Sequence, residues 1–224
     1  MCGAPLEYYT ESRRLTCEIC KKEKKANAAC LNGHFVCDSC HIEGSAKIIS
    51  FLQNSSEKDP TSLLIEIMNM PEVHMHGPEH HAIVACVLLT AAKNCGADFK
   101  LAPALYEAWQ RGSEVPGGTC GMYGVCGAAA GAGAFASVLL ESTPLNEEQW
   151  SFPIELASKC LHKIAQIGGP RCCKRTSRLS IETAAEMMSE KLGIEIPTSR
   201  PSCTFYKKNN ECILAKCPYF PKKK

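Results

Sequence analysis

Two Cys-x-x-Cys pairs lie near the beginning of the chain, Cys17/Cys20 and Cys37/Cys40, with a basic, polar stretch between them. Two such knuckles can supply four thiolates, which is the ligand set of a closed tetrahedral structural zinc site. Chance pairing at this spacing is improbable even in a sequence rich in cysteine. We therefore predict that residues 1–44 form a zinc-binding module.

Cys30 and His34 lie between the two knuckles, in an order that resembles the later part of a RING-type or treble-clef-like zinc finger. A second zinc ion on Cys2, Cys30 and His34 is one ligand short, and His41 is an alternative donor. The other interpretation is that Cys30 and His34 pack beside a single zinc ion. The resemblance implies a module that contacts other proteins, and it does not imply ubiquitin-ligase activity.

A histidine cluster occupies residues 71–81, with the sequence PEVHMHGPEHH. Pro78 suits the first turn of a helix, so His80 would lie at the helix entry while His74 and His76 approach from the preceding loop. Imidazole is a common ligand of zinc, iron, nickel and copper. We predict that these three histidines bind a metal ion or substrate, with His76 and His80 as the leading pair; the alternative is that they cap the helix or face solvent.

Cys120 and Cys126 lie in a glycine-rich loop, residues 117–128, that leads into a helix of small residues. Glycine allows a ligand to approach the backbone closely, and a helix N-terminus stabilises anions, including thiolates. Both cysteines are therefore predicted to have a low pKa and to be reactive. The alternative is that each is a small buried apolar residue.

A second pair of cysteines, Cys172 and Cys173, is flanked by the cations Arg171, Lys174 and Arg175 and precedes another predicted helix. These charges favour thiolate and suit an anionic substrate or cluster, so we predict an anion-binding site at the three basic residues.

The two cysteine-containing loops are predicted to meet in space, Cys120 or Cys126 with Cys172 or Cys173, although about fifty residues separate them. Two helix N-termini directed at one point would create the positive field that an iron–sulfur cluster, a persulfide or a phosphate requires. We therefore expect these four cysteines to be the catalytic residues or cluster ligands.

Three further cysteines, Cys203, Cys212 and Cys217, form a C-x8-C-x4-C-P pattern near the end of the chain. A terminal Cys-Pro is typical of some iron–sulfur sites, including [4Fe–4S] sites, but this spacing is not diagnostic. With a fourth donor the same residues suit a second structural zinc site, and both interpretations stay open.

The 16 cysteines among 224 residues indicate either disulfides or metal and thiol chemistry. The first 15 residues contain four charges and no apolar run, so they do not resemble a secretory signal, and we expect reduced cysteines in a cytoplasmic protein. The longest uncharged stretch, Val115–Leu140, contains a proline and many glycines, and a membrane span is not expected. Residues 171–224 carry 12 basic against 5 acidic side chains, which makes this third the anion-seeking part.

The rest of the sequence predicts a mainly α fold. Residues 45–60 are expected to form a helix and a polar linker, residues 61–200 a helical domain, and residues 201–224 an irregular, basic tail that contains cysteine. The segment 79–94 is apolar nearly all round, as is typical of a buried central helix. The other helices are predicted from their apolar spacing near 61–69, 102–111, 126–141, 154–167 and 177–192.

Taken in order, the motifs CxxC…CxxGHxVCxxCH, HxHGPEHH, GGTCGxYGxCGAxxGxG, IGGPRCCKR and C…C…CP resemble an uncharacterised cysteine-rich family of anaerobic bacteria and methanogenic archaea. The resemblance runs from Cys17 to Cys217 and implies no established activity. The central loop is also distantly similar to the C-GCAxxG-C-C family, whose members are ascribed a redox role, although here the order is Cys-Gly-Ala.

These patterns favour a metal- and thiol-dependent protein that carries out redox chemistry, sulfur transfer, or modification of a cofactor or RNA. No C-x3-C-x2-C triplet indicates radical S-adenosylmethionine chemistry, and no GxxxxGK[ST] segment indicates nucleotide hydrolysis. The competing interpretation is a non-catalytic binding or assembly factor, in which the zinc module holds a protein partner and the basic C-terminal third contacts RNA or a cofactor.

Overall fold

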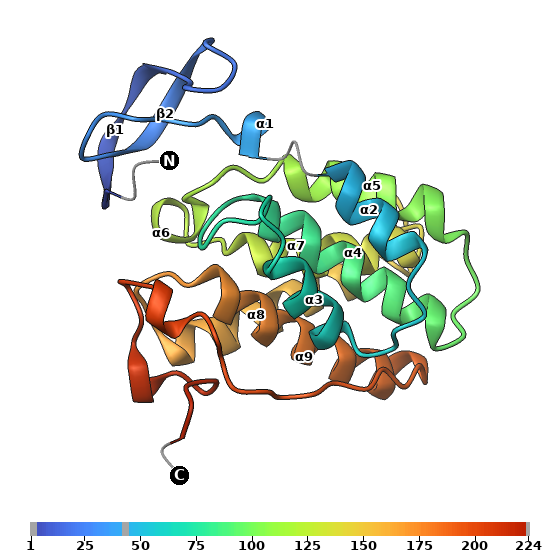
Figure 1. Cartoon of the computed structure of the whole chain (residues 1–224). Helices are drawn as coiled ribbons and strands as arrows, with labels where there is room; N and C mark the ends of the chain where they lie inside the picture. Colours follow the sequence, from blue (N-terminus) through green and yellow to red (C-terminus); the bar gives the residue numbers. More distant parts are fainter. Residues whose placement is uncertain (1–3, 42–44, 223–224) are drawn as a thin grey trace.

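The computed structural model describes residues 4–41 and 45–222. A two-stranded sheet, β1 (Leu6–Thr16) and β2 (Glu23–Cys30), lies at one corner of a helical bundle, and the short helix α1 (Asp38–His41) follows it (Figure 1). The mainly helical fold with a small N-terminal cysteine module is confirmed, whereas the β-hairpin in that module was not predicted.

The hairpin is antiparallel, with Leu6 opposite Cys30 at one end and Thr16 opposite Glu23 at the other. Its register shifts between Tyr8 and Arg13, and most side chains of β1 are exposed. The buried apolar cluster of this module consists of three cysteines and one valine: Cys17, Val36, Cys37 and Cys40. So small a cluster cannot hold the hairpin by apolar burial alone, which leaves the cysteines to do so.

The helical domain contains long helices near the predicted positions. They are α2 (Ser45–Gln53), α3 (Pro60–Met68), α4 (Glu79–Asn94), α5 (Leu101–Ser113), α7 (Gly127–Leu139), α8 (Ser151–Ile167) and α9 (Cys173–Leu192), with the single-turn α6 (Thr119–Met122) before α7. The last helix begins at Cys173 and not near Ser177 as expected. Cys172 therefore occupies the N-cap position without a side-chain capping hydrogen bond, and Cys173 lies in the first turn.

The central helix is α4, as its apolar sequence predicts, because every side chain from Glu79 to Ala92 is buried. It packs against α5, α7 and α9, and α3 covers another side. Glycines allow α7 and α5 each to approach α4 closely. A Cβ at Gly131 of α7 would lie 2.1 Å from the carbonyl oxygen of His81, and one at Gly112 of α5 would lie 2.4 Å from the Cα of Ala82. The small residues of α7 thus act in packing, as the sequence indicates.

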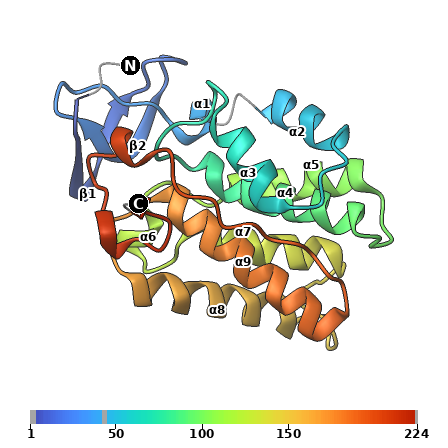
Figure 2. The ribbon, with the colours of Figure 1, turned by 60° about the horizontal axis from the view of Figure 1, so that its bottom comes forward.

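After α9 the tail turns back and runs antiparallel to that helix until it reaches the N-terminal end of α9, as Figure 2 shows. The guanidinium of Arg178 donates to the carbonyl oxygen of Pro201 at 2.6 Å, and Arg200 forms an ion pair with Glu182 at 3.0 Å. Two short 3-10 turns, η1 (Tyr206–Lys208) and η2 (Leu214–Lys216), interrupt an otherwise irregular backbone. The tail is therefore a strap along the helical domain.

Within the part of the chain that the structure describes, no helix is long and apolar enough to cross a membrane. No disulfide bond links the cysteines of those same residues.

Candidate metal centre and adjoining cavities

The two N-terminal knuckles form a compact group of sulfur atoms. The Sγ atoms of Cys17, Cys20, Cys37 and Cys40 all lie within 4.8 Å of one another, and Cys20 and Cys37 are 3.8 Å apart. Metal–sulfur bonds of about 2.3 Å at tetrahedral angles place two sulfurs about 3.8 Å apart. The prediction that these four cysteines can hold a metal ion is confirmed.

The electrostatics of this group call for a cation at its centre. Burial raises the pKa of Cys17, but backbone N–H groups, including that of Cys37 at 3.4 Å from its sulfur, outweigh burial and lower that pKa to about 6. Burial and the three neighbouring thiols raise the pKa of Cys40 to about 12. Four thiols this close ionise together only when a metal ion compensates their charge.

Cys30 and His34 also lie close together, with 3.4 Å between Sγ and Nδ1 and a hydrogen bond of 3.2 Å from the backbone N–H of His34 to the Cys30 sulfur. Two ligands of one zinc ion lie about 3.5 Å apart, so the pair fits a second zinc site. The third predicted ligand, Cys2, lies outside the described residues, as does the side chain of His41. Whether the module binds one metal ion or two is therefore not decided by these residues, and both alternatives stay predictions.

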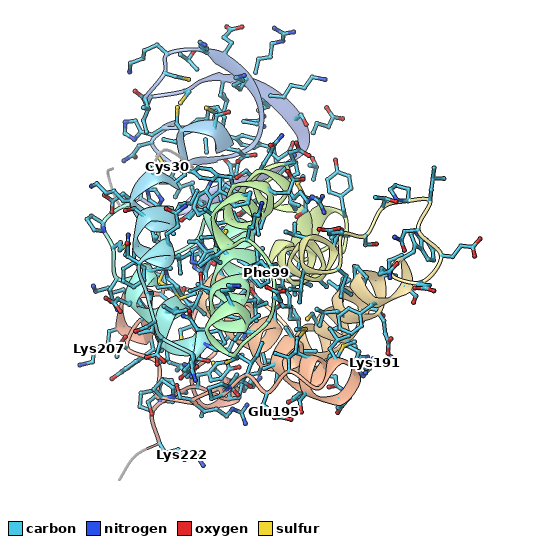
Figure 3. The ribbon with its side chains drawn as sticks, turned by 90° about the vertical axis from the view of Figure 1, so that its right-hand side faces the viewer. Cys30, Phe99, Lys191, Glu195, Lys207 and Lys222 are labelled. Carbon is cyan, nitrogen blue, oxygen red and sulfur yellow. The ribbon has the colours of Figure 1, made fainter. Side chains whose placement is uncertain are left out.

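A cavity of about 1190 Å3, called here the large cavity, lies between the hairpin and the N-terminal ends of α4, α7 and α9. Figure 3 shows Cys30, one of its lining residues, where the hairpin meets the helices. Many of the side chains that line it can ligate a metal, titrate or bind anions. From the N-terminal module these are Tyr8, Lys24, Lys25, Cys30, His34, Cys37 and Asp38, and from the helical domain and tail they are His76, His80, His81, Cys120, Cys126, Arg171, Cys172, Cys173, Arg175 and Glu211.

Two adjacent histidines at the start of α4 present one ring nitrogen each. The Nδ1–H of His80 donates to the carbonyl of Gly77 at 3.1 Å, and that of His81 donates to the carbonyl of Val115 at 3.0 Å. Nε2 of each ring is then the acceptor nitrogen, and in His80 this atom is buried without a hydrogen-bond partner. Burial, and then the charge of Lys174, lower the pKa of His80 to about 3, so the ring is neutral.

His76 reaches the same cavity from the preceding loop, with Nε2 3.1 Å from the side-chain oxygen of Asn209 and 3.4 Å from Glu211. His74 is not brought to the site: its Nδ1 lies 3.4 Å from the buried carboxylate of Glu79, and it lines neither cavity. Of the three histidines predicted from the sequence, His76 and His80 line the large cavity and His74 does not. His81 lines the cavity instead, and no pattern in the sequence pointed to Asn209.

Cys120, Cys126, Cys172 and Cys173 all line the large cavity. Their predicted low pKa is wrong for three of them, because burial raises the pKa of Cys120 and Cys172 and raises that of Cys173 to about 12. Burial here outweighs the helix N-termini and the charge of Arg171. Such thiols ionise when they bind a metal or another cation, or when a base takes their proton.

The three predicted anion-binding residues differ in their contacts. Arg171 lines the large cavity, where it pairs with Glu211 at 3.3 Å and lies 5.1 Å from the centre of the Tyr8 ring. Arg175 also lines the large cavity, but it is buried and its guanidinium donates to the carbonyls of Gly168 and Pro170.

Lys174 is also buried, does not line the large cavity, and donates to the carbonyl of His74 at 2.7 Å. Burial lowers the pKa of its amine to about 8. Of the three predicted residues, Arg171 has the position that an anion in the large cavity would require.

A second cavity, of about 370 Å3 and called here the small cavity, lies between α9, α3 and the tail. It is lined by four cysteines: Cys172, Cys203, Cys212 and Cys217. Cys172 lines both cavities, and its position beside the tail cysteines was not predicted, because nothing in the spacing connects residues so far apart. Aromatic residues close the small cavity: Phe205, Tyr206, Tyr219 and Phe220.

Within residues 4–41 and 45–222, the only set of three or more metal-ligating side chains with donor atoms within 4.8 Å of one another is the N-terminal cysteine group. The predicted ligands His76 and His80, and the tail cysteines, therefore do not form a compact site for a single ion. Tyr8 and Glu211 also line the large cavity, Asn209 contacts His76 from the small cavity, and no motif in the sequence pointed to these three residues.

Comparison with known proteins gives one result. No curated protein and no solved structure matches the chain. A family model described as "Family of unknown function (DUF5714)" matches residues 48–220, from α2 through the tail, and leaves the N-terminal cysteine module outside the match. The chain therefore belongs to the DUF5714 family, whose function is unknown.

Proposed function

We propose that the protein is a metal- and thiol-dependent enzyme that carries out redox chemistry or sulfur transfer on an anionic substrate in the large cavity. The observation that carries this proposal is that Cys120, Cys126 and Cys173 line one cavity together with Arg171 and the neutral ring of His80. Convergence of thiols, a cation and an unpartnered imidazole nitrogen in one cavity is typical of an active site.

The N-terminal cysteine group is proposed to bind zinc in a structural role. Four thiolates close the coordination sphere of zinc and leave no open position for a substrate. The module has almost no apolar core, so metal binding supplies the stability that burial cannot. Zinc would thereby fix the hairpin that forms one wall of the large cavity.

An anion in the large cavity would meet two helix N-termini as well as Arg171. Neither α7 nor α9 has a side-chain cap, because Cys126 and Cys172 occupy the capping positions without accepting a hydrogen bond there. The first N–H groups of both helices are therefore open to an anionic ligand. Glu211, which pairs with Arg171, would have to exchange this contact for one with the substrate.

Sulfur transfer is a reaction that these groups can perform. A thiolate attacks the outer sulfur of thiosulfate, the bond between the two sulfurs breaks, sulfite leaves with the electron pair, and the cysteine becomes a persulfide. The attacking thiol must first lose its proton to solvent or to a base on the substrate, because an imidazole whose pKa is lowered to about 3 does not hold it. In a redox reaction, two thiols would instead form a disulfide and transfer two electrons and two protons to a disulfide substrate.

Thiosulfate tests the proposal as both an anion and a sulfur donor. The full chain, purified without oxygen, should gain one sulfur atom on Cys120, Cys126 or Cys173, as measured by mass spectrometry of its peptides. The triple variant Cys120→Ser/Cys126→Ser/Cys173→Ser should gain none, while Cys95→Ser, at the end of α4 and away from the cavity, should behave as wild type. Uptake by the triple variant, or no uptake and no disulfide formation with oxidised glutathione in wild type, would contradict the proposal.

Arg171→Gln should weaken thiosulfate binding about tenfold, since a charge-assisted hydrogen bond in a partly buried site contributes ~1.5–3 kcal/mol and part of this is already used by Glu211. Isothermal titration measures the dissociation constant directly. Arg13→Gln is the matched control, because Arg13 stacks on Tyr9 at the exposed face of the hairpin. Equal affinities of the two variants for thiosulfate would show that Arg171 does not bind the anion.

A second candidate function, a binding factor for a protein or RNA, is favoured by the exposed surface of the hairpin module. Leu31 and Ile19 expose 65% and 51% of their surface there, beside exposed lysines. The predicted contact between the basic C-terminal third and RNA is less favoured, because Lys174, Arg175 and Arg178 are all buried. This function would be supported over the first if the wild-type protein retained RNA and showed no thiol reactivity, and if the variant Lys24→Glu/Lys25→Glu did not retain RNA.

A further inference from the structure

We propose that Cys172, Cys203, Cys212 and Cys217 together bind one [4Fe–4S] cluster in the small cavity. These cysteines come from two segments that are distant in sequence, the N-terminal cap of α9 and the tail, and the fold places all four around one cavity. The proposal concerns a different site from the large cavity and does not depend on the reaction assigned there.

The spacing of the four sulfurs distinguishes a cluster from a single ion. A zinc ion requires its four sulfurs close together, and in the N-terminal group they all lie within 4.8 Å of one another. Within the described ranges 4–41 and 45–222, the tail cysteines and Cys172 do not form so compact a set. They surround a cavity of about 370 Å3. Four irons and four sulfides between the ligands hold cysteine sulfurs farther apart than one ion does, and this cavity has the room for them.

N–H groups around these sulfurs provide the second kind of support. The side-chain amide of Asn209 donates to the Cys172 sulfur at 3.6 Å, and the backbone N–H of Leu214 donates to the Cys212 sulfur at 3.4 Å. Leu214 adopts a left-handed backbone with φ of 51°, a conformation that is uncommon for leucine and is found at ligand-binding turns. Such N–H donors stabilise the thiolates of iron–sulfur clusters.

Charge in the surrounding helix is the third observation. Lys174, Arg175 and Arg178 line the small cavity and are each less than 5% exposed. Three buried cations within five residues are costly unless negative charge lies among them.

Carboxylates lie near two of these cations, Glu79 near Lys174 and Glu182 near Arg178. Arg178 donates to the carbonyl of Pro201 and stacks on Tyr219, yet its Nε is buried without a hydrogen-bond partner. Four thiolates around a [4Fe–4S] core carry net negative charge, which is what these cations would compensate.

The remaining walls are of a kind that protects a cluster. Phe205, Tyr206 and Phe220 line the small cavity, and Tyr206 and Phe220 pack edge to face with ring centres 5.1 Å apart. Pro218 follows Cys217 directly and contributes no N–H group. An apolar wall of this type limits the access of water and oxygen to the metal.

The test is the iron and acid-labile sulfide content of the full chain, expressed and purified without oxygen and reconstituted with ferrous iron and sulfide. Wild type should contain about four irons and four sulfides per chain and, after reduction, give the electron paramagnetic resonance signal of a [4Fe–4S] cluster. Cys172→Ser should lose at least half of this iron. Cys173→Ser is the matched control and should keep it, because Cys173 is the next residue yet lines only the large cavity.

Cys212→Ser repeats the test in the tail, where a substitution does not disturb the helical core, and circular dichroism verifies that each variant is folded. Zinc in place of iron at these cysteines under iron-replete conditions would overturn the proposal. So would full iron and sulfide content in both Cys172→Ser and Cys212→Ser. Neither result depends on thiosulfate, so failure of the cluster and failure of the thiol chemistry are distinguishable.

Discussion

Cys37→Ser should release the metal ion of the N-terminal group and unfold the hairpin while the helical domain stays folded. Cys37 supplies one of the four sulfurs, and the buried apolar cluster around it is made of Val36 and other members of the same group. Metal binding contributes ~10–16 kcal/mol of apparent free energy to comparable small modules, far more than so small a cluster can. The loss of one ligand therefore removes most of the stability of this module.

Metal analysis and limited proteolysis measure this effect together. The variant should lose one zinc equivalent and become sensitive to trypsin within residues 17–40, which contain several lysines. Cys95→Ser, at the C-terminal cap of α4, removes a cysteine outside the group and should change neither quantity. Unchanged zinc content in Cys37→Ser would show that the four cysteines do not hold the metal.

Gly131→Ala should lower the free energy of unfolding of the helical domain by about 1–3 kcal/mol, the usual cost of overpacking. Its new Cβ would lie 2.1 Å from the carbonyl oxygen of His81, and that oxygen belongs to the backbone of the central helix and cannot move aside. Alanine is intrinsically better than glycine in a helix by about 1 kcal/mol, so a net loss would show that the contact dominates.

Gly133→Ala is the matched control for this prediction. It makes the same change two residues further along α7, where a Cβ would meet the carbonyl oxygen of Pro153 at 3.2 Å and the Cβ of Ala157 at 3.4 Å. Small shifts relieve contacts of this length, so its cost should be clearly lower. Urea denaturation followed by circular dichroism gives both values, and equal stabilities would disprove the close contact between α4 and α7 at Gly131.

The helices were predictable because their signal is local. The segment Ala82–Ala92 is apolar on every side and is wholly buried, and the amphipathic stripes of α8 and α9 indicated flanking helices. The hairpin was not predictable, because β1 is exposed along most of its length and lacks the alternation of apolar and polar residues that marks a half-buried strand. We expect the cysteine group to hold its strands together, and the periodicity of apolar residues carries no signal for this.

The candidate site was predictable in its residue types and less so in their grouping. The knuckle spacing identified all four cysteines of the N-terminal group. Cys172 was grouped with the central loop, and its place beside Cys203 and Cys217 depends on the tail folding back along α9. The low pKa expected of Cys173 was wrong because local charge and helix position can be read from the sequence, whereas burial cannot.

The strap formed by the tail also sets an order of events during synthesis. Asn209 and Glu211 contact His76 and Arg171 at the large cavity, and three of the four cysteines of the small cavity lie at or beyond residue 203. On the ribosome, a growing chain can complete α4, α7 and α9 while Cys172 and Cys173 are still open to the surrounding solution. The large cavity is not complete until Glu211 has emerged, and the small cavity is not complete until Phe220 has emerged, so protection of the thiols in both cavities must follow translation of nearly all of this sequence.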